Sequence, residues 1–349
     1  MKTIKIAERA VGLGHPCFII AEAGVNHNGS IEMARQLVDV AVLAGADAIK
    51  FQTFKAERLV TPDAPKANYQ LETTGASETQ YQMLHRLELS LEAHRELMAY
   101  CQQKGILFMS TPFDEQSANL LADLGVALFK IPSGEITNLP FLSHVAQKNK
   151  PMIVSTGMSY LGEVESAVRT IQETSNQKLV LLHCVSNYPA DPADTNLRAM
   201  HTMATAFGVP VGYSDHTPGI EVALAAVALG ACVIEKHFTL DRNLPGPDHR
   251  ASLEPDELAG MIKGIRVVEA ALGNGCKLPA ASEANTASVV RKSLVAARDL
   301  LAGTVLTKDM IAIKRPGTGL SPSMRDELIG RTLNQDIQRG TLLALEMLS

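Results

Sequence analysis

The chain has 349 residues, of which 46% are hydrophobic and 20% charged, and its formal net charge is −5. This composition is typical of a globular protein and lacks a basic excess, so no nucleic-acid partner is expected. The five cysteines are odd in number and show no CxxC spacing, which argues against a disulfide framework or a structural zinc site. Without a secretory leader or an apolar run of membrane length, we expect a cytoplasmic protein with no membrane partner.

Eight short apolar runs recur along the first three quarters of the chain, and helical patterns separate most of them. Apolar strands that alternate with helices indicate a parallel sheet covered on both faces. Eight such units in about 250 residues are typical of a (β/α)8 TIM barrel, which we assign to residues 1–275. A doubly wound open sheet is the structural alternative. The predicted strands are residues 17–21, 46–51, 106–110, 127–131, 151–155, 179–184, 209–213 and 231–236.

A local repeat supports the barrel. In three places a helical pattern reaches a glycine, a short turn follows, and an apolar strand ends on lysine. Glycine suits the end of a helix because it adopts the left-handed conformation that stops the helix. The three units run from Gly45 to Lys50, from Gly125 to Lys130 and from Gly230 to Lys236.

The segment 53–88 departs from the repeat because it is long, polar and weakly periodic. Loops of this length are usually functional or disordered. The segment follows the second predicted strand, so we expect it over the carboxyl face of the barrel, where such enzymes keep their chemistry.

The last part of the chain has a different pattern. Residues 276–288 lie in a stretch rich in Gly, Ala, Ser and Asn and are predicted to be a linker. Beyond them, residues 299–306 are echoed by residues 336–343, which indicates a small β-rich domain over 289–349. About 60 residues are marginal for independent folding, so we expect this domain to dock on something.

Polar side chains follow every predicted strand at its carboxyl end. Cations and hydroxyls that converge there from several strands predict a site for a phosphate or a carboxylate. The alternative for any one lysine is a solvated surface group. The candidates are Lys50, Lys130, Ser133, Ser155 and Ser214.

Two further kinds of chemistry are indicated at the same face. His216 and His237 end the seventh and eighth strands, and paired imidazoles suit Mn, Fe, Co or Zn. For each histidine, a packed or hydrogen-bonded role is the alternative. Glu22 and Glu135 lie near lysines and are candidates for acid–base work, with a simple ion pair as the alternative.

These residues lie in motifs that resemble the sialic acid synthase family, in order and along the whole chain. The segment 314–319, Lys-Arg-Pro-Gly-Thr-Gly, is similar to the signature of that family's antifreeze-like (SAF) domain. The barrel motifs are Ile20-Ala-Glu22-Ala-Gly-Val-Asn26-His27-Asn-Gly29, Lys50-Phe-Gln52, Ser110-Thr-Pro-Phe113, Lys130-Ile-Pro-Ser133-Gly-Glu135, Ser155-Thr-Gly-Met158, Ser214-Asp-His216, Glu235-Lys-His237-Phe and Pro245-Gly-Pro-Asp248-His249.

The resemblance implies a reaction. Phosphoenolpyruvate, water and an open-chain N-acyl hexosamine would give a nine-carbon α-keto acid and phosphate. The acceptor stays open between 2,4-diacetamido-2,4,6-trideoxymannose, leading to N,N'-diacetyllegionaminate, and N-acetylmannosamine, leading to N-acetylneuraminate. The stretches 66–70 and 136–140 look like both types of synthase, and we favour the legionaminate type.

The resemblance also implies roles for individual residues. A divalent ion, commonly Mn²⁺ with Mg²⁺ or Co²⁺ as alternatives, would bind His216 and His237, and Glu135 would face the reacting centre. Phosphoenolpyruvate would be held by Lys50, Lys130, Ser133, Ser155 and Ser214. The remaining substrate contacts would come from Glu22, Gln52, Thr111, Tyr188 and Asp248.

Two positions carry further implications. Arg315 would come from the partner subunit of a domain-swapped homodimer and reach over the barrel mouth to the N-acyl group. Some family members have asparagine two residues before the motif tyrosine, where this chain has Ser186. The asparagine contact is therefore in doubt, and Ser186 or the neighbouring Asn187 is the candidate to replace it.

Three other functions fit parts of the pattern. One is a phosphoenolpyruvate condensation that makes a shorter sugar acid, against which the SAF-like tail argues. Another is a Schiff-base aldolase that uses Lys50, Lys130 or Lys236. The third is a ligand-binding module on an inert barrel.

Overall fold

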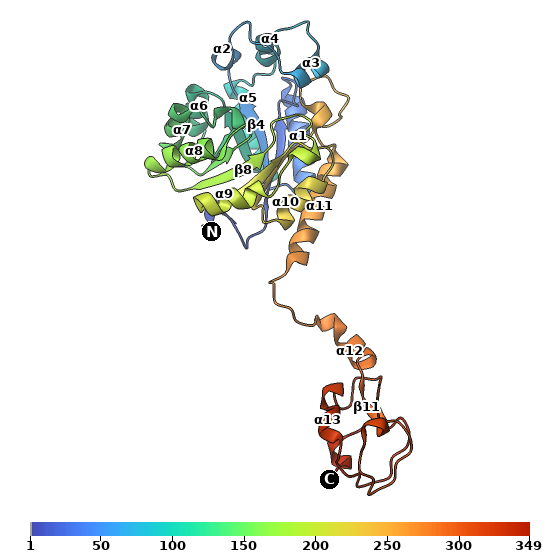
Figure 1. Ribbon diagram of the computed structural model, residues 1–349. Coiled ribbons are helices and arrows are strands. Elements are labelled where there is room, and N and C mark those ends of the chain that lie inside the picture. Colours follow the sequence, from blue (N-terminus) through green and yellow to red (C-terminus); the bar gives the residue numbers. More distant parts are fainter. Residues whose placement is uncertain (1) are drawn as a thin grey trace. The chain divides into compact units, whose positions relative to one another are not determined.

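The computed structural model describes residues 2–349. The chain divides between residues 273 and 274 into two compact units, called here the barrel unit and the C-terminal unit (Figure 1). Within residues 2–349, no helix is long and apolar enough to cross a membrane.

Eight parallel strands form the wall of the barrel unit (Figure 1). Ladders join them in the order β5-β4-β3-β10-β9-β8-β7-β6, and β5 lies beside β6, so the sheet forms a nearly closed barrel. Each predicted run overlaps one of these strands, which confirms the (β/α)8 prediction over the open sheet. The strands are β3 (Phe18–Gly24), β4 (Ala48–Thr53), β5 (Leu107–Pro112), β6 (Phe129–Ile131), β7 (Met152–Ser155), β8 (Leu179–Cys184), β9 (Val211–Asp215) and β10 (Val233–His237).

Amphipathic helices alternate with the strands and bury their apolar stripes against the outside of the barrel. The repeated glycines end or follow these helices in the left-handed conformation, with φ of 83° at Gly45, 84° at Gly125 and 96° at Gly230. The helices are α1 (Ile31–Ala44), α5 (Leu91–Lys104), α6 (Glu115–Asp123), α7 (Leu139–Ala146), α8 (Leu161–Glu173), α9 (Ala199–Phe207), α10 (Glu221–Ala228) and α11 (Pro255–Leu272), with short 3-10 turns at Ser133–Glu135, Pro192–Asp194 and His249–Ala251.

An N-terminal hairpin of β1 (Ile4–Ile6) and β2 (Arg9–Val11) precedes the barrel and was not anticipated. Its apolar residues pack with the inward-facing side chains near the strand starts, including Phe18, Ile20 and Val233. The amino end of the barrel is therefore filled by side chains, and a ligand has access from the carboxyl ends of the strands.

The segment between β4 and α5 is more regular than expected. It contains the short helices α2 (Ala56–Leu59), α3 (Asn68–Thr74) and α4 (Gln80–His85), which lie at one end of the barrel unit (Figure 1). Lys66 fixes part of it, because its buried amine donates to Thr74 and Gly75 and pairs with Glu78 at 3.3 Å. We call residues 54–88 the rim segment.

The C-terminal unit is small and β-rich, as predicted. It holds α12 (Ala284–Val290) and α13 (Arg325–Leu328), the antiparallel strands β11 (Ser293–Ala296) and β12 (Ile311–Lys314), and 3-10 turns at Ala281–Glu283, Lys308–Met310, Pro322–Met324 and Leu345–Met347. Leu300 and Ile337, at matching positions of the sequence repeat, pair in an antiparallel bridge. Part of the predicted linker is thus helical, because α12 begins at Ala284.

Candidate active site

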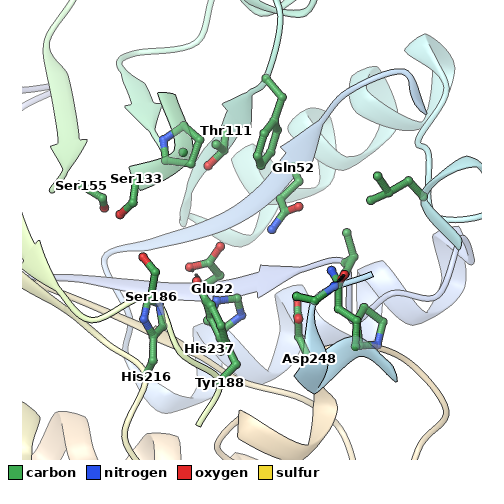
Figure 2. Close-up of a pocket in the computed structure, with 18 of the residues that line it drawn as sticks. Glu22, Gln52, Thr111, Ser133, Ser155, Ser186, Tyr188, His216, His237 and Asp248 are labelled. Carbon is green, nitrogen blue, oxygen red and sulfur yellow. Dashed lines mark hydrogen bonds and ion pairs between the residues drawn. The ribbon is translucent and has the colours of Figure 1, made fainter. Parts of the chain in front are cut away.

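A cavity of about 420 Å³ opens at the carboxyl ends of the barrel strands and reaches the rim segment. The predicted site residues of the barrel line it, with Glu135 as the exception, and Figure 2 shows several of their polar ends pointing into this space. The predicted residues that line it are Glu22, Lys50, Gln52, Thr111, Lys130, Ser133, Ser155, Ser186, Tyr188, Ser214, His216, His237 and Asp248.

Lys50 is buried at the centre of the polar half of this cavity. Its Nζ donates to Glu22 Oε1 at 2.5 Å and to Thr111 Oγ1 at 3.0 Å. Burial works against its charge, but Glu22 and Glu235 outweigh that effect and raise the pKa of Lys50 above its ordinary value. Lys50 therefore carries a positive charge inside the barrel.

Glu235 is the second buried carboxylate of the cavity, and three predicted anion ligands meet it. Ser214 Oγ donates to its Oε1 at 2.8 Å, Lys130 Nζ lies 3.2 Å from the same oxygen, and Lys50 Nζ lies 3.6 Å from Oε2. Among the described residues, no hydrogen bond is made to Glu235 Oε2. A carboxylate thus occupies the centre towards which these donors converge.

The charges in this half of the cavity balance. Lys50 and Lys130 are positive, and Glu22 and Glu235 pair with them at the distances given above. Burial opposes ionisation of Glu22, but His237, Lys50 and Lys130 outweigh it and hold the pKa of Glu22 well below its ordinary value. An anionic substrate would therefore need further positive charge beside these four groups.

The two predicted imidazoles lie close together, with ring centroids 5.6 Å apart (Figure 2). His216 Nδ1 bonds to the Val185 carbonyl at 2.6 Å, which leaves Nε2 to face Ser214 Oγ at 3.4 Å. Burial, with His237 nearby, lowers the pKa of His216 to about 3, so its imidazole is neutral. His237 Nε2 lies 3.3 Å from Glu22 Oε2, while its buried Nδ1 has no hydrogen-bond partner among the described residues.

These features fit a divalent cation. A histidine that bonds a backbone carbonyl through one nitrogen presents the other as a ligand, and two imidazoles suit Mn or Co better than Ca. Within residues 2–349, no three His, Cys, Asp or Glu side chains are placed to hold an ion together. Other ligands would be water or substrate.

Two hydroxyl groups of the site come from Ser133, in the 3-10 turn after β6, and Ser155, at the end of β7. Ser133 Oγ accepts from the Gly157 amide at 3.0 Å and lies 3.1 Å from Cys184 Sγ. A Cβ at Gly157 would come within 2.2 Å of Ser186 Oγ and 2.9 Å of Ser133 Oγ, so a larger residue there would displace these two hydroxyls. Ser155 Oγ is buried and, among the described residues, unpartnered, which is the state of a group that awaits a ligand.

An aromatic wall links the site to the rim segment. The Tyr188 ring lies 4.2 Å from that of His216 and 5.1 Å from that of Tyr69 on α3. Burial raises the pKa of Asp248, which also lines the cavity, against the opposing effect of His237. Gln52 and Asp248 lie on the same side of the view in Figure 2, away from Ser133 and Ser155.

Two predicted residues lie elsewhere. Glu135 ends the 3-10 turn after β6 and accepts from Asn138 Nδ2 at 2.7 Å, so it does not line the cavity. Arg315 belongs to the C-terminal unit, is exposed, and donates from Nε to the Val290 carbonyl at 3.1 Å.

Sequence reasoning gave no role to Glu235 and Tyr69. Side chains alternate along a strand, so Glu235 shares the inner face of β10 with His237, and this spacing could have identified it. Tyr69 lies on a seven-residue helix in a segment without clear periodicity, so the pattern gave it no role, although the stretch 66–70 resembles the synthases.

Comparisons with known proteins agree with this architecture. The profile of the NeuB family matches residues 37–277, and that of the SAF domain matches residues 291–349. N,N'-diacetyllegionaminic acid synthase of Legionella pneumophila is 50% identical, over 96% of this chain and 95% of that protein. Its counterpart from Campylobacter jejuni is 49% identical, over 93% and 98%. The crystal structure of N-acetylneuraminic acid synthetase from Leptospira borgpetersenii, in complex with citrate, is 37% identical and superposes with a TM-score of 0.72, covering 82% of this chain and 95% of that one.

The chain therefore belongs to the NeuB family, with a C-terminal SAF domain. It is an enzyme, a phosphoenolpyruvate-dependent synthase of nonulosonic (sialic) acids. This assignment confirms the resemblance. It argues against the two alternative functions, a Schiff-base aldolase and a ligand-binding module on an inert barrel.

Proposed function

We propose that the enzyme condenses phosphoenolpyruvate with 2,4-diacetamido-2,4,6-trideoxymannose and water, and releases N,N'-diacetyllegionaminate and phosphate. Support for this sugar comes from the two relatives that are about half identical over nearly the whole chain, both legionaminic acid synthases. N-acetylmannosamine is the second candidate, because the Leptospira synthetase shares the fold at 37% identity.

Lys50, Lys130 and Ser214 lie in the cavity lining beside Glu235, and this cluster of buried donors carries the phosphoenolpyruvate part of the proposal. We assign these three groups to phosphoenolpyruvate, because buried charged and hydroxyl donors bind phosphate and carboxylate oxygens strongly. The hydroxyls of Thr111, Ser133 and Ser155 complete the set, since all three line the same cavity.

His216 and His237 are the residues that would hold a divalent ion, for which Mn²⁺ is the first candidate and Mg²⁺ or Co²⁺ the alternatives. The neutral imidazole of His216 and the balanced charges around Lys50 support an added cation at this place. When bound, the ion would supply Lewis acidity towards the sugar aldehyde.

The sugar is assigned to the part of the cavity lined by Gln52, Tyr188 and Asp248, with Glu22 and Ser186 between it and the phosphoenolpyruvate donors. Carbon 3 of phosphoenolpyruvate forms the new bond to the aldehyde carbon, whose oxygen takes up a proton. Water adds to carbon 2, and phosphate leaves from that carbon to give the keto group. Positive charge develops at carbon 2, and we place Glu22 there as its electrostatic partner, a role first predicted for Glu135.

We further propose a domain-swapped homodimer in the cytoplasm. Arg315 would reach the N-acyl group of the sugar in the partner's barrel, because its planar guanidinium suits a carbonyl oxygen. Random mixing of equal amounts of inactive Arg315→Ala and His237→Ala subunits would restore about a quarter of the wild-type activity, because about half of the dimers are mixed and half of the sites in those dimers are intact. No recovery after confirmed subunit exchange would overturn the swap.

The experiment for the reaction itself is a phosphate-release assay with phosphoenolpyruvate, Mn²⁺ and each sugar in turn, with mass detection of the nine-carbon product. Faster turnover with 2,4-diacetamido-2,4,6-trideoxymannose supports the proposal. A preference for N-acetylmannosamine would move the assignment to N-acetylneuraminate synthesis.

A further inference from the structure

The cavity has two halves of different chemistry. The strand ends supply its charged groups, whereas the rim segment supplies an apolar wall. Leu59 at the end of α2, Val60 directly after it and Leu84 on α4 are half-buried and line the cavity. Met83 and Leu87 also line the cavity and are buried, with 0% and 1% exposure, in a cluster with Val25 and Phe54.

No free cation lines this apolar half within the described residues. Lys50 and Lys130 are the cations of the cavity lining, and both pair with carboxylates at its charged base. The cations of the rim segment are also paired: Lys55 with Glu88 and Arg58 with Asp114, for example. A phosphate on the distal part of the sugar would therefore lie against apolar side chains without a counter-charge from the barrel unit, because the proposed Arg315 is assigned to the N-acyl group.

Neutral hydrogen-bonding groups accompany the apolar wall. Gln52, Gln70 and Gln80 line the cavity, and Gln80 Nε2 donates to Gln70 Oε1 at 3.3 Å. Amide side chains offer both donors and acceptors, which match an acylamino group rather than an ion. The apolar wall and the amides together suit an uncharged sugar that carries methyl groups.

We propose that Leu59, Val60 and Leu84 form a specificity pocket for the methyl-bearing substituents at the end of the sugar away from the aldehyde. The ligand class is an uncharged 6-deoxyhexosamine with two acylamino groups. This inference rests on the proposed function, because it takes the aldehyde to lie at the charged base. One methyl group in an apolar pocket changes kcat/KM by about 10- to 200-fold.

The test compares kcat/KM for three acceptors at saturating phosphoenolpyruvate and Mn²⁺: 2,4-diacetamido-2,4,6-trideoxymannose, N-acetylmannosamine and its 6-phosphate. Wild-type enzyme should prefer the first over the second by about tenfold or more and should not use the third. Val60→Thr, which keeps the side-chain volume, and Leu84→Gln should each reduce the preference by about threefold or more. The change should lie in the KM of the sugar, with the KM of phosphoenolpyruvate unchanged.

Leu71→Gln is the matched control, because Leu71 is 40% exposed on α3 and does not line the cavity. It should leave the preference unchanged. An unchanged preference in both Val60→Thr and Leu84→Gln would overturn the pocket while leaving the proposed reaction intact. Equal use of the 6-phosphate by wild-type enzyme would also overturn it. Absence of phosphate release with every acceptor would instead overturn the proposed function.

Discussion

Two buried groups of lysines and carboxylates lie on opposite faces of the same barrel wall. Lys236 on β10 pairs with Asp215 on β9 at 2.7 Å and also donates to the Thr217 carbonyl, outside the cavity lining. Lys50 and Lys130 face the cavity with Glu22 and Glu235. Alternation along β10 separates the groups, since Glu235 and His237 point inwards and Lys236 points outwards.

The difference between the groups shows that burial of charge does not by itself mark a functional site. The outer pair is satisfied, because Asp215 Oδ1 also accepts from the amide and hydroxyl of Thr217. The inner group leaves Glu235 Oε2 without a hydrogen bond among the described residues and opens onto a cavity. Unsatisfied groups on the inner face are therefore the ones we connect with ligands.

Metal removal should have the largest effect on the inner face. Chelation should abolish phosphate release, and added Mn²⁺ should restore it. The two lysines on this face are already paired with two carboxylates, so an anionic substrate needs the additional positive charge of the ion. His216→Ala and His237→Ala should lose Mn²⁺ binding in calorimetry as well as activity. His201→Ala, on the exposed surface of α9, serves as the control, and full activity in chelator would refute the ion's role.

Breaking the outer pair should affect stability instead. Asp215→Asn leaves Lys236 buried without its counter-charge, and we expect the free energy of unfolding to fall by about 3–5 kcal/mol in urea titrations. Asp215→Asn combined with Lys236→Met should recover most of this loss. A variant of normal stability that has lost phosphoenolpyruvate binding would show that the outer pair belongs to the site.

A smaller effect is expected where the rim segment meets the inner face. Tyr69 packs beside Tyr188 and its hydroxyl accepts from Gln70 Nε2 at 3.3 Å. Tyr69 also lines the cavity, and we expect its hydroxyl to donate to the sugar. Tyr69→Phe would remove that bond of about 0.5–1.5 kcal/mol, so the KM of the sugar should rise about two- to tenfold. Tyr81 does not line the cavity, so Tyr81→Phe is the control and should leave the KM of the sugar unchanged. A rise in the KM of phosphoenolpyruvate, with the KM of the sugar unchanged, would contradict the assignment of Tyr69 to the sugar.

The barrel was predictable because its signals are local: apolar runs, and glycines such as Gly45 and Gly125 that end helices. The strand-end residues followed from the same repeat. The rim helices were missed because they span only four to seven residues, too few for a helical period to show. The direction of Glu135 depends on the 3-10 turn Ser133–Glu135 and on Asn138, which strand periodicity does not describe.

The most direct test of this account is the affinity for phosphoenolpyruvate of variants from the two faces, measured by calorimetry with Mn²⁺ present. Lys130→Met should raise the Kd by about tenfold or more, because a charge-assisted bond contributes about 1.5–3 kcal/mol. The Asp215→Asn/Lys236→Met variant should keep the Kd within about twofold of the wild type. Unchanged affinity in Lys130→Met, with weakened binding in the outer double variant, would contradict the assignment of the inner face to the substrate anion.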